Sequence, residues 1–334
     1  MEYACLYCCH ITNAGAGNCG ICGRAKVPIR LWSDYKDTPN LASVTNFNPP
    51  TRKVAFDVHV NAAAHEVYVV VKVSLSYEDY AGVKNGDQWV YQPVEWTGTQ
   101  KTDFLKLFQA SIGLWDGHHP VSCGGVNYTV MFFVESVTFW AHAEVRATAS
   151  SLAIEKIGDT TENRLWTAGV SLLEPYPALM PAAASGTRPG PRLYTKRVAV
   201  KSVVKDSALA DNHANQAHYN PMAHEFGHLL GLPDEYNVYG FAANTVPVAA
   251  NYAANNESRP AAFWLKLLDN YGLALPGWGQ YGTGLNQVQE HSIMRDAHTG
   301  AGGFLRRHYV TVLEALNYIT AHNARGGLNG VWSI

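Results

Sequence analysis

Several features that would place this chain in a familiar class are absent from its sequence. No apolar run reaches about 18 residues, the shortest length typical of a transmembrane helix, so we expect no membrane span. The 25 basic and 27 acidic residues nearly balance, and a formal net charge of -2 gives no reason to expect binding to nucleic acid or to an anionic membrane through bulk charge. Charged residues make up only 16% of the chain and hydrophobic residues 47%, which is typical of a globular protein that buries a core.

The N-terminus also lacks the features of a secretory signal peptide. Met1 to Cys5 contains no basic segment, and no apolar stretch of the kind found in signal peptides follows it. We therefore expect a protein that is cytoplasmic as synthesised, or one that is exported by a specialised secretion system without a cleaved signal.

Cysteine is scarce and unevenly placed. Five of the six cysteines lie within the first 22 residues and only Cys123 lies beyond them, which is not the spread of a disulfide framework. The spacing C-x2-C-x10-C-x2-C is formed by Cys5, Cys8, Cys19 and Cys22, and it is typical of a four-thiolate structural zinc site. A module this small cannot bury a core, so the bound zinc ion would have to provide its stability.

The second half of this cysteine module has the form of a zinc knuckle. In Cys19 to Gly23, which reads C-G-I-C-G, glycine would let backbone N–H groups approach the sulfur atoms. The module resembles a short zinc ribbon and, more loosely, a RanBP2-type finger, although no Trp precedes Cys5 and Asn13 is shifted by one position. Cys9 is either a spare thiol or a replacement for Cys8 as a ligand. The alternative is a redox-active or disordered tail, and the sequence indicates no partner for the ribbon.

The most informative segment runs from His224 to Asp234 and reads H-E-x-x-H-x-x-G-x-x-D. Side chains four apart on a helix share a face, so His224 and His228 would present two imidazoles to one zinc ion. Glu225 would lie beside the metal, where it can accept a proton from zinc-bound water. Gly231 should end the helix, because glycine adopts positive φ without strain, and the turn would bring Asp234 back as a third ligand. Three protein ligands leave a fourth position for water, as in a catalytic zinc site.

Other interpretations of this segment are weaker but remain open. The first is an ordinary helix whose histidines are satisfied by hydrogen bonds. Glu235 is the nearest rival to Asp234 as the third ligand. A thermolysin-like site would take its third ligand from a later helix, where Glu257 is the best candidate. A deuterolysin-like site needs G-T-x-x-D, but the segment that begins at Gly282 has Asn286 in place of the Asp.

The zinc-binding segment resembles the metzincin clan of zinc endopeptidases, in the variant whose third ligand is Asp. That clan also has a methionine-containing turn below the zinc ion. The segment His291 to Arg295 is similar to this turn, with Met294 as the turn residue. Some metzincins have, two residues after this Met, a Tyr that stabilises the transition state, but Asp296 stands here. The candidates for that role are Tyr236, His308 and Tyr309.

The resemblance implies a zinc-dependent endopeptidase that acts on a protein or peptide substrate, with Glu225 activating the zinc-bound water. Metzincins are often kept latent by a cysteine on the catalytic zinc, and Cys9 or Cys123 would be available for this. The run from Ala223 through Tyr236 is also similar to metallopeptidase domains of bacterial secreted toxins and effectors. Two alternatives are a zinc amidase acting on peptidoglycan stem peptides, and a non-enzymatic zinc-ribbon binding protein on a peptidase-like scaffold. The intact Glu225 argues against the scaffold, which has no need of a base.

The pattern of apolar residues predicts both strands and helices. Alternation from Val54 to Val60 and from Val67 to Tyr77, around a turn at Asn61 to His65, predicts a hairpin. Further strands are predicted at Tyr128 to Val134 and between 135 and 210, including Arg197 to Val204. A helix capped by Thr102 should carry Phe104, Phe108, Ile112 and Trp115 on one stripe. Later helices should follow Ser258, with Phe263, Leu267 and Tyr271 on a stripe, and extend from Leu305 to about His322.

These elements predict an α+β fold. We expect a zinc-ribbon-like module at 1–25, a linker at 26–50 and a metzincin-like metallopeptidase domain at 51–334. The domain should contain a twisted mixed sheet, an active-site helix and a C-terminal helix, and the chain should hold one catalytic and one structural zinc ion.

Overall fold

The computed structural model describes most of the N-terminal half of the chain and selected parts of the rest. The described residues are 1–6, 10–21, 23–49, 54–77, 80–85, 88–93, 97–149, 168–175, 196–197, 220–232, 261–273, 292–296, 303–322, 328 and 330–334. Strands and helices both occur along them, which confirms the predicted mixture of α and β structure.

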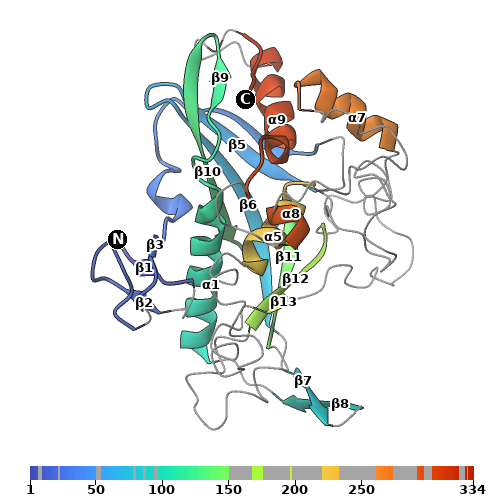
Figure 1. Cartoon of the computed structure of the whole chain (residues 1–334). Helices are drawn as coiled ribbons and strands as arrows, with labels where there is room; N and C mark the ends of the chain where they lie inside the picture. Colours follow the sequence, from blue (N-terminus) through green and yellow to red (C-terminus); the bar gives the residue numbers. More distant parts are fainter. Residues whose placement is uncertain are drawn as a thin grey trace. The chain divides into compact units, whose positions relative to one another are not determined.

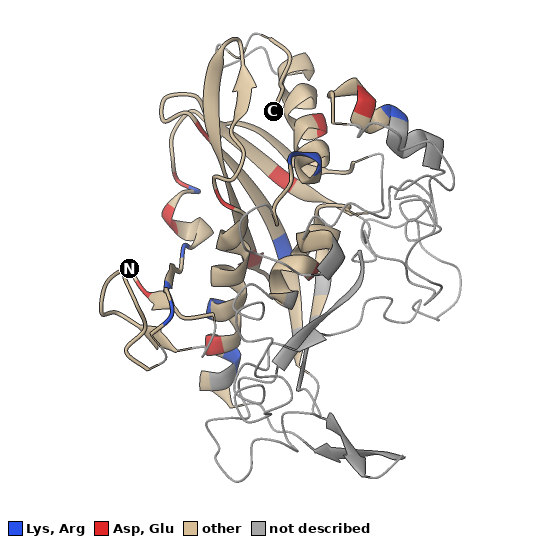
Figure 2. Cartoon of the chain, in the orientation of Figure 1, with Lys and Arg blue, Asp and Glu red and all other residues tan. Residues whose placement is uncertain are grey.

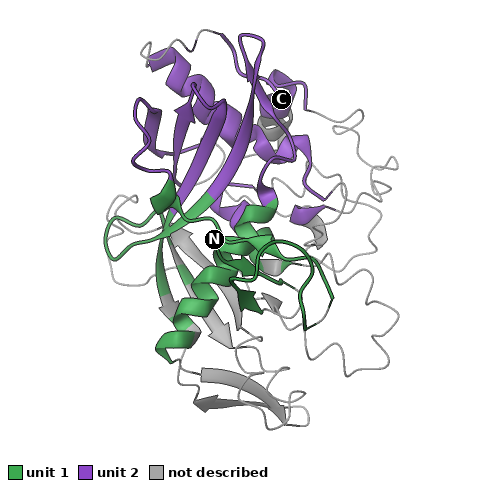
Figure 3. Ribbon diagram, turned by 90° about the vertical axis from the view of Figure 1, so that its left-hand side faces the viewer, with its two compact units in different colours: residues 1–34, 72–114, 133–225 green, residues 35–71, 115–132, 226–334 purple. Residues whose placement is uncertain are grey.

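The chain divides into two compact units, shown in green and purple in Figure 3. Unit 1 contains 1–34, 72–114 and 133–225, and unit 2 contains 35–71, 115–132 and 226–334. The division falls inside two strands, one 3-10 helix and one α-helix, so these continuous elements contribute residues to each unit. The domain boundaries predicted at residues 25 and 50 stay predictions.

The predicted hairpin is present in unit 2. Strand β5 (Phe56–Asn61) pairs antiparallel with β6 (Glu66–Tyr77), in a register that sets Val58 opposite Val69 and Asn61 opposite Glu66. In the turn, the Asn61 side chain accepts a hydrogen bond of 3.1 Å from the Ala64 N–H. The alternating valines are buried, and this explains why period 2 predicted the hairpin correctly.

The strands of the main sheet run in both directions. In spatial order they are β13-β12-β11-β6-β10-β9, with β5 also on β6 and β4 on β5. Strand β11 is parallel to β6, whereas β12 is antiparallel to β11. Their bounds are β4 (Ala42–Phe47), β9 (Val121–Cys123), β10 (Val126–Ser136), β11 (Ala143–Ala149), β12 (Ala168–Pro175) and β13 (Lys196–Arg197). The predicted strand at Tyr128 to Val134 is thus confirmed within β10, whereas most of the one predicted at Arg197 to Val204 lies outside the described residues.

Two smaller sheets belong to unit 1. The first joins the cysteine module to the segment after it, in the order β2-β1-β3, and the second is a hairpin of β7 and β8. Their bounds are β1 (Tyr3–Ala4), β2 (Ile11–Thr12), β3 (Val27–Pro28), β7 (Tyr80–Asn85) and β8 (Gln88–Pro93). A 3-10 helix, η1 (Trp32–Asp34), follows β3.

Helix α1 (Gly98–Ile112) carries the predicted apolar stripe but begins earlier than predicted. Phe104, Phe108 and Ile112 are buried as expected, and Trp115 follows in a 3-10 helix, η2 (Gly113–Trp115). The prediction that Thr102 caps this helix is wrong. Its hydroxyl donates a hydrogen bond of 3.0 Å to the Gly98 carbonyl one turn earlier, which is how a threonine bonds inside a helix.

The predicted C-terminal helix is present and lies along β4 and β5 in unit 2 (Figure 1). It starts with a 3-10 turn, η7 (Arg306–Tyr309), and continues as α9 (Val310–His322). Two other helices are α7 (Ala261–Asn270) and the short α8 (Ile293–Asp296). Helix α7 matches the helix predicted after Ser258, but Ser258 itself lies outside the described residues.

The described helices and the charges along them agree with the composition. None of these helices is long and apolar enough to cross a membrane. Basic and acidic residues are interspersed along the described elements (Figure 2).

Candidate metal centre

The helix that carries the H-E-x-x-H motif, α5 (Pro221–Leu229), has a well-defined beginning. Asn220 precedes it, and its side-chain oxygen accepts a hydrogen bond of 2.9 Å from the Ala223 N–H. Pro221 occupies the first helical position, where the absent N–H is no loss. The Asn220 amide also donates to the Ser111 hydroxyl over 3.1 Å. This cap was not predicted, although an Asn-Pro pair before an apolar run is a known start signal.

The end of α5 is fixed by Gly231, as predicted. Gly231 has a φ of 88°, a conformation that side chains with a Cβ rarely adopt. Its N–H donates to the His228 carbonyl over 3.0 Å, and the Leu232 N–H donates to the Gly227 carbonyl over 3.0 Å. These two bonds form a Schellman motif, which turns the chain sharply after the helix.

Three residues of the predicted catalytic site lie together on α5. One ligand atom from each of His224, Glu225 and His228 can be chosen so that all three lie within 4.8 Å of one another. The three side chains are buried, with exposures of only 1% to 2%. Among the described residues, this is the single cluster of His, Cys, Asp and Glu side chains that could hold a metal ion.

A hydrogen bond sets the protonation of His228. Its Nδ1 lies 2.7 Å from the Leu232 carbonyl oxygen, and because a carbonyl only accepts, Nδ1 must carry the hydrogen. The other ring nitrogen, Nε2, then presents its lone pair, and it is buried. A histidine that ligates zinc typically has this arrangement, with the second nitrogen bonded to a carbonyl or carboxylate.

The burial of Glu225 also fits a cation at this point. A carboxylate removed from water costs several kcal/mol unless positive charge or hydrogen bonds compensate for it. Glu225 is only 2% exposed and shares its part of α5 with two imidazoles. A divalent metal ion beside it would supply the compensating charge, so the donor set suits zinc.

Met294 lies against α5 at the residue before His228. It is buried in α8, and a Cβ added to Gly227 would overlap its sulfur atom. The same added Cβ would lie 3.0 Å from Cε of Met294 and 3.3 Å from Cζ2 of Trp115. Any larger residue here would have to displace the end of the methionine side chain, which packs directly on the helix backbone. The contact places Met294 against the helix that carries the motif, and the methionine turn stays a prediction.

An aromatic cluster in unit 2 surrounds this contact. The ring of Trp115 lies 5.1 to 6.5 Å from five other rings, measured between centroids. These rings are those of Phe132, Phe226, Phe304, His308 and Tyr309. The Tyr309 hydroxyl donates a hydrogen bond of 2.8 Å to the Trp115 carbonyl, and burial raises the pKa of Tyr309 well above its usual range. Tyr309 thus stays a neutral donor within the core.

The structure describes only two of the remaining predicted catalytic residues, His308 and Tyr309. Asp234, its rivals Glu235 and Glu257, and the candidate Tyr236 lie outside the described residues. His308 and Tyr309 are buried and hydrogen-bonded to groups of the core. Those contacts give both side chains a packing role and do not support their predicted part in stabilising a transition state.

The cysteine module shows one feature expected of a zinc knuckle. The Ile21 N–H points at Sγ of Cys19 over 3.4 Å, as predicted for a backbone that approaches a thiolate. The Cys19 N–H donates to the Arg24 carbonyl over 2.6 Å, and the Gly23 N–H donates back to the Cys19 carbonyl over 2.8 Å, which closes a tight turn. Cys5 is also buried. The predicted ligands Cys8 and Cys22, and the alternative Cys9, lie outside the described residues.

Cys123, a candidate for latency, is buried in β9. Burial raises the pKa of its thiol, which disfavours the thiolate that would bind zinc. Its sulfur lies 3.5 Å from a Cβ built on Gly330 in the C-terminal segment. These surroundings do not support a latency role for Cys123.

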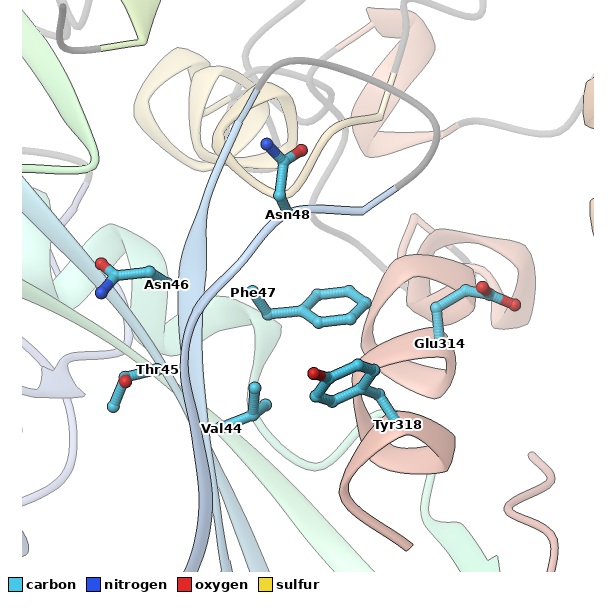
Figure 4. Close-up of a pocket in the computed structure, with 7 residues that line it drawn as sticks. All are labelled: Val44, Thr45, Asn46, Phe47, Asn48, Glu314 and Tyr318. Atoms are coloured by element: carbon cyan, nitrogen blue, oxygen red, sulfur yellow. The ribbon is translucent and has the colours of Figure 1, made fainter. Parts of the chain in front are cut away.

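A pocket of about 500 Å³ lies in unit 2 between β4 and α9 (Figure 4). Phe47 and Tyr318 form its aromatic wall, with ring centroids 5.8 Å apart. Val44, Thr45, Asn46, Asn48 and Glu314 complete the lining. None of these seven residues belongs to the predicted metal centre.

Comparison of the chain with family models, with curated proteins and with solved structures finds no match. The interpretation of the site therefore rests on its own residues and geometry.

Proposed function

We propose that this chain is a zinc-dependent endopeptidase. The observation that carries the proposal is the convergence of His224, Glu225 and His228 on one buried part of α5. The hydrogen bond from His228 to Leu232, which prepares Nε2 for a metal, adds support. So does the methionine that packs on the helix at Gly227.

Each residue has a defined part in the proposed reaction. His224 and His228 hold the zinc ion, and Asp234 is the proposed third ligand. A zinc ion held by these residues would supply Lewis acidity for the scissile carbonyl and would lower the pKa of the attacking water toward ~7. Glu225 accepts the proton of the attacking water and then donates it to the amine of the leaving peptide. The burial of Glu225 keeps bulk water from competing for that proton.

We also propose a structural zinc ion in the cysteine module, held by Cys5, Cys8, Cys19 and Cys22. The N–H to sulfur contact of Ile21 and the tight turn after Cys19 support it. Such contacts are expected where backbone amides stabilise a thiolate ligand.

The proposed activity is tested by replacing Glu225 with Gln and measuring both zinc content and cleavage of a peptide library. We expect Glu225→Gln to retain zinc and to lose about 10²- to 10⁴-fold in turnover, the usual contribution of a general base. Glu135→Gln, the same change at a half-buried position of β10, is the matched control and should leave turnover unchanged.

Two outcomes would contradict the proposal. Equal cleavage by the wild type and Glu225→Gln would remove Glu225 from the reaction. Release of stem peptides from peptidoglycan without cleavage of any ordinary peptide would assign the chain to the amidases, which use the same metal and base.

A further inference from the structure

His308 forms a hydrogen-bonded network with the methionine turn. The Leu305 N–H donates to Nδ1 of His308 over 3.0 Å, so Nδ1 is an acceptor and the hydrogen of the neutral ring must be on Nε2. Nε2 lies 3.3 Å from Oγ of Ser292 and donates to it. Ser292 Oγ also accepts a hydrogen bond of 3.1 Å from the Met294 N–H. His308 and Met294 are therefore joined through one hydroxyl.

These groups are fully enclosed, which makes the network rigid. His308 and Met294 have no exposed surface and Ser292 is 1% exposed. The Trp115 ring packs on the His308 ring at a centroid distance of 6.0 Å. Water cannot readily replace a lost bond in such surroundings, so the removal of either hydrogen-bonding group would weaken the network.

Met294 connects this network to His228, the proposed metal ligand. Its side chain fills the space beside Gly227, the residue directly before His228. The Gly227 carbonyl accepts the hydrogen bond of the Leu232 N–H, and the Leu232 carbonyl in turn accepts that of His228 Nδ1. All these residues belong to unit 2, and Figure 1 labels the two helices concerned, α5 and α8. A shift of Met294 would therefore alter both the backbone and the ring orientation of His228.

We propose that His308 is a positioning residue for the metal centre, which acts through Ser292 and Met294 to fix the orientation of His228. The inference rests on the proposed zinc site, and it assigns His308 a role different from transition-state stabilisation. It also gives Ser292 a specific function in the turn, as the hydroxyl shared by His308 and Met294.

Two substitutions of His308 separate the two ends of the network. In His308→Asn, the side-chain oxygen can still accept the Leu305 N–H, but nothing reaches Ser292. In His308→Gln, the longer amide can still donate to Ser292 Oγ. The matched control is His322→Asn, because His322 is an exposed histidine on the neighbouring helix α9 whose ring bonds to the Tyr318 carbonyl.

The main measurement is zinc affinity, obtained by competition with a chelator. Because two zinc sites are proposed, the step in the titration that is lost in His224→Ala is assigned to the site on α5. We expect His308→Asn to weaken this step about 10- to 100-fold, the usual effect of losing a group that orients a metal ligand. His308→Gln should recover most of the affinity, and His322→Asn should match the wild type. With a peptide substrate, His308→Asn should lower kcat much more than it changes KM.

A merely structural role would give a different result. In that case His308→Asn would lower the unfolding temperature of the metal-free protein but leave the zinc affinity of its folded fraction unchanged, which would overturn the proposal. If His308→Asn does not fold, Ser292→Ala makes the same test from the other end of the network.

The outcomes also distinguish this inference from the proposed function. If the zinc affinities follow the expected order but no peptide is cleaved, the positioning role stands and the endopeptidase proposal fails. If His224→Ala removes no zinc from the wild-type content, α5 binds no metal and both proposals fail.

Discussion

The two proposed metal sites of this chain are built in opposite ways. Around α5, the ligands lie on a helix that is capped at both ends and packed against Met294 and Trp115. Among the described residues of the cysteine module, the regular structure amounts to two β-strands of two residues each, and Ile21, whose N–H points at Cys19, is 64% exposed. Around α5, protein packing holds the proposed ligands in place before a metal ion binds. In the cysteine module, the metal ion itself would provide most of the stability.

This difference follows from how much apolar surface each region buries. The α5 region includes several of the largest fully buried side chains, among them Trp115, Phe226 and Tyr309. Burial of such side chains stabilises a fold by roughly 1.5–3 kcal/mol each. The cysteine module has no comparable set among its described residues, so the proposed metal–thiolate bonds and its contacts with the rest of unit 1 would supply its stability. One of these contacts is the ion pair of Glu2 with Lys106 of α1, at 2.8 Å.

The largest expected effect is that of metal removal. After treatment with a strong chelator, the amides of Cys5 and Cys19 should lose protection from hydrogen exchange, because structural zinc typically contributes about 10–16 kcal/mol to modules of this kind. The amides of Leu230 and Leu232 at the end of α5 should stay protected. Peptide-level exchange measured by mass spectrometry tests both regions in one sample. Equal protection of the cysteine amides with and without metal would show that packing on the rest of unit 1 holds the module. The two sites would then not differ in how far their structure depends on metal.

A smaller effect is expected from Gly227→Ala. An alanine inside a helix is normally more stable than glycine by ~1 kcal/mol, but here its Cβ would overlap the Met294 sulfur. We therefore expect a net destabilisation of about 1–3 kcal/mol, the usual range for overpacked cores, in urea unfolding. The control is Gly98→Ala at the start of α1, where nothing lies within 4 Å of the added Cβ. A stabilised Gly227→Ala protein would show that the contact around α5 is looser than the structure indicates.

The smallest effect is expected at the helix starts. Asn220→Ala removes the cap of α5 and should cost about 1 kcal/mol. Thr102→Ala should cost much less, because Thr102 bonds inside α1 and does not cap it. Thermal unfolding of both variants compares the two positions, and a larger loss for Thr102→Ala than for Asn220→Ala would reverse our assignment of the caps.

Local sequence patterns predicted the parts of the fold that depend on local geometry. The alternation of Val58 and its neighbours produced the hairpin of β5 and β6, since period 2 follows directly from the pleat of a strand. The spacing of His224 and His228 placed both on one part of α5, and Gly231 ended the helix because positive φ is a property of the residue itself.

Local sequence signals did not correctly predict where the helices begin. Thr102 has the side chain of a cap, but the residues before it also adopt helical structure, and α1 extends back to Gly98. Asn220, which does cap α5, was not predicted, although the Asn-Pro pair there is a local start signal. The start of α5 is also held by a tertiary contact, because the Asn220 amide donates to the Ser111 hydroxyl of α1.

The sequence by itself determined the chemistry that we propose for this protein: which side chains would bind a metal ion, which carboxylate would serve as a base, and where the helix that carries them ends. Only the tertiary structure decided how those groups are held. The contact of Met294 with Gly227, and the hydrogen bonds that join His308, Ser292 and Met294, connect segments that are distant in the sequence. No periodicity records such contacts, because they arise from the packing of separate elements around one buried core.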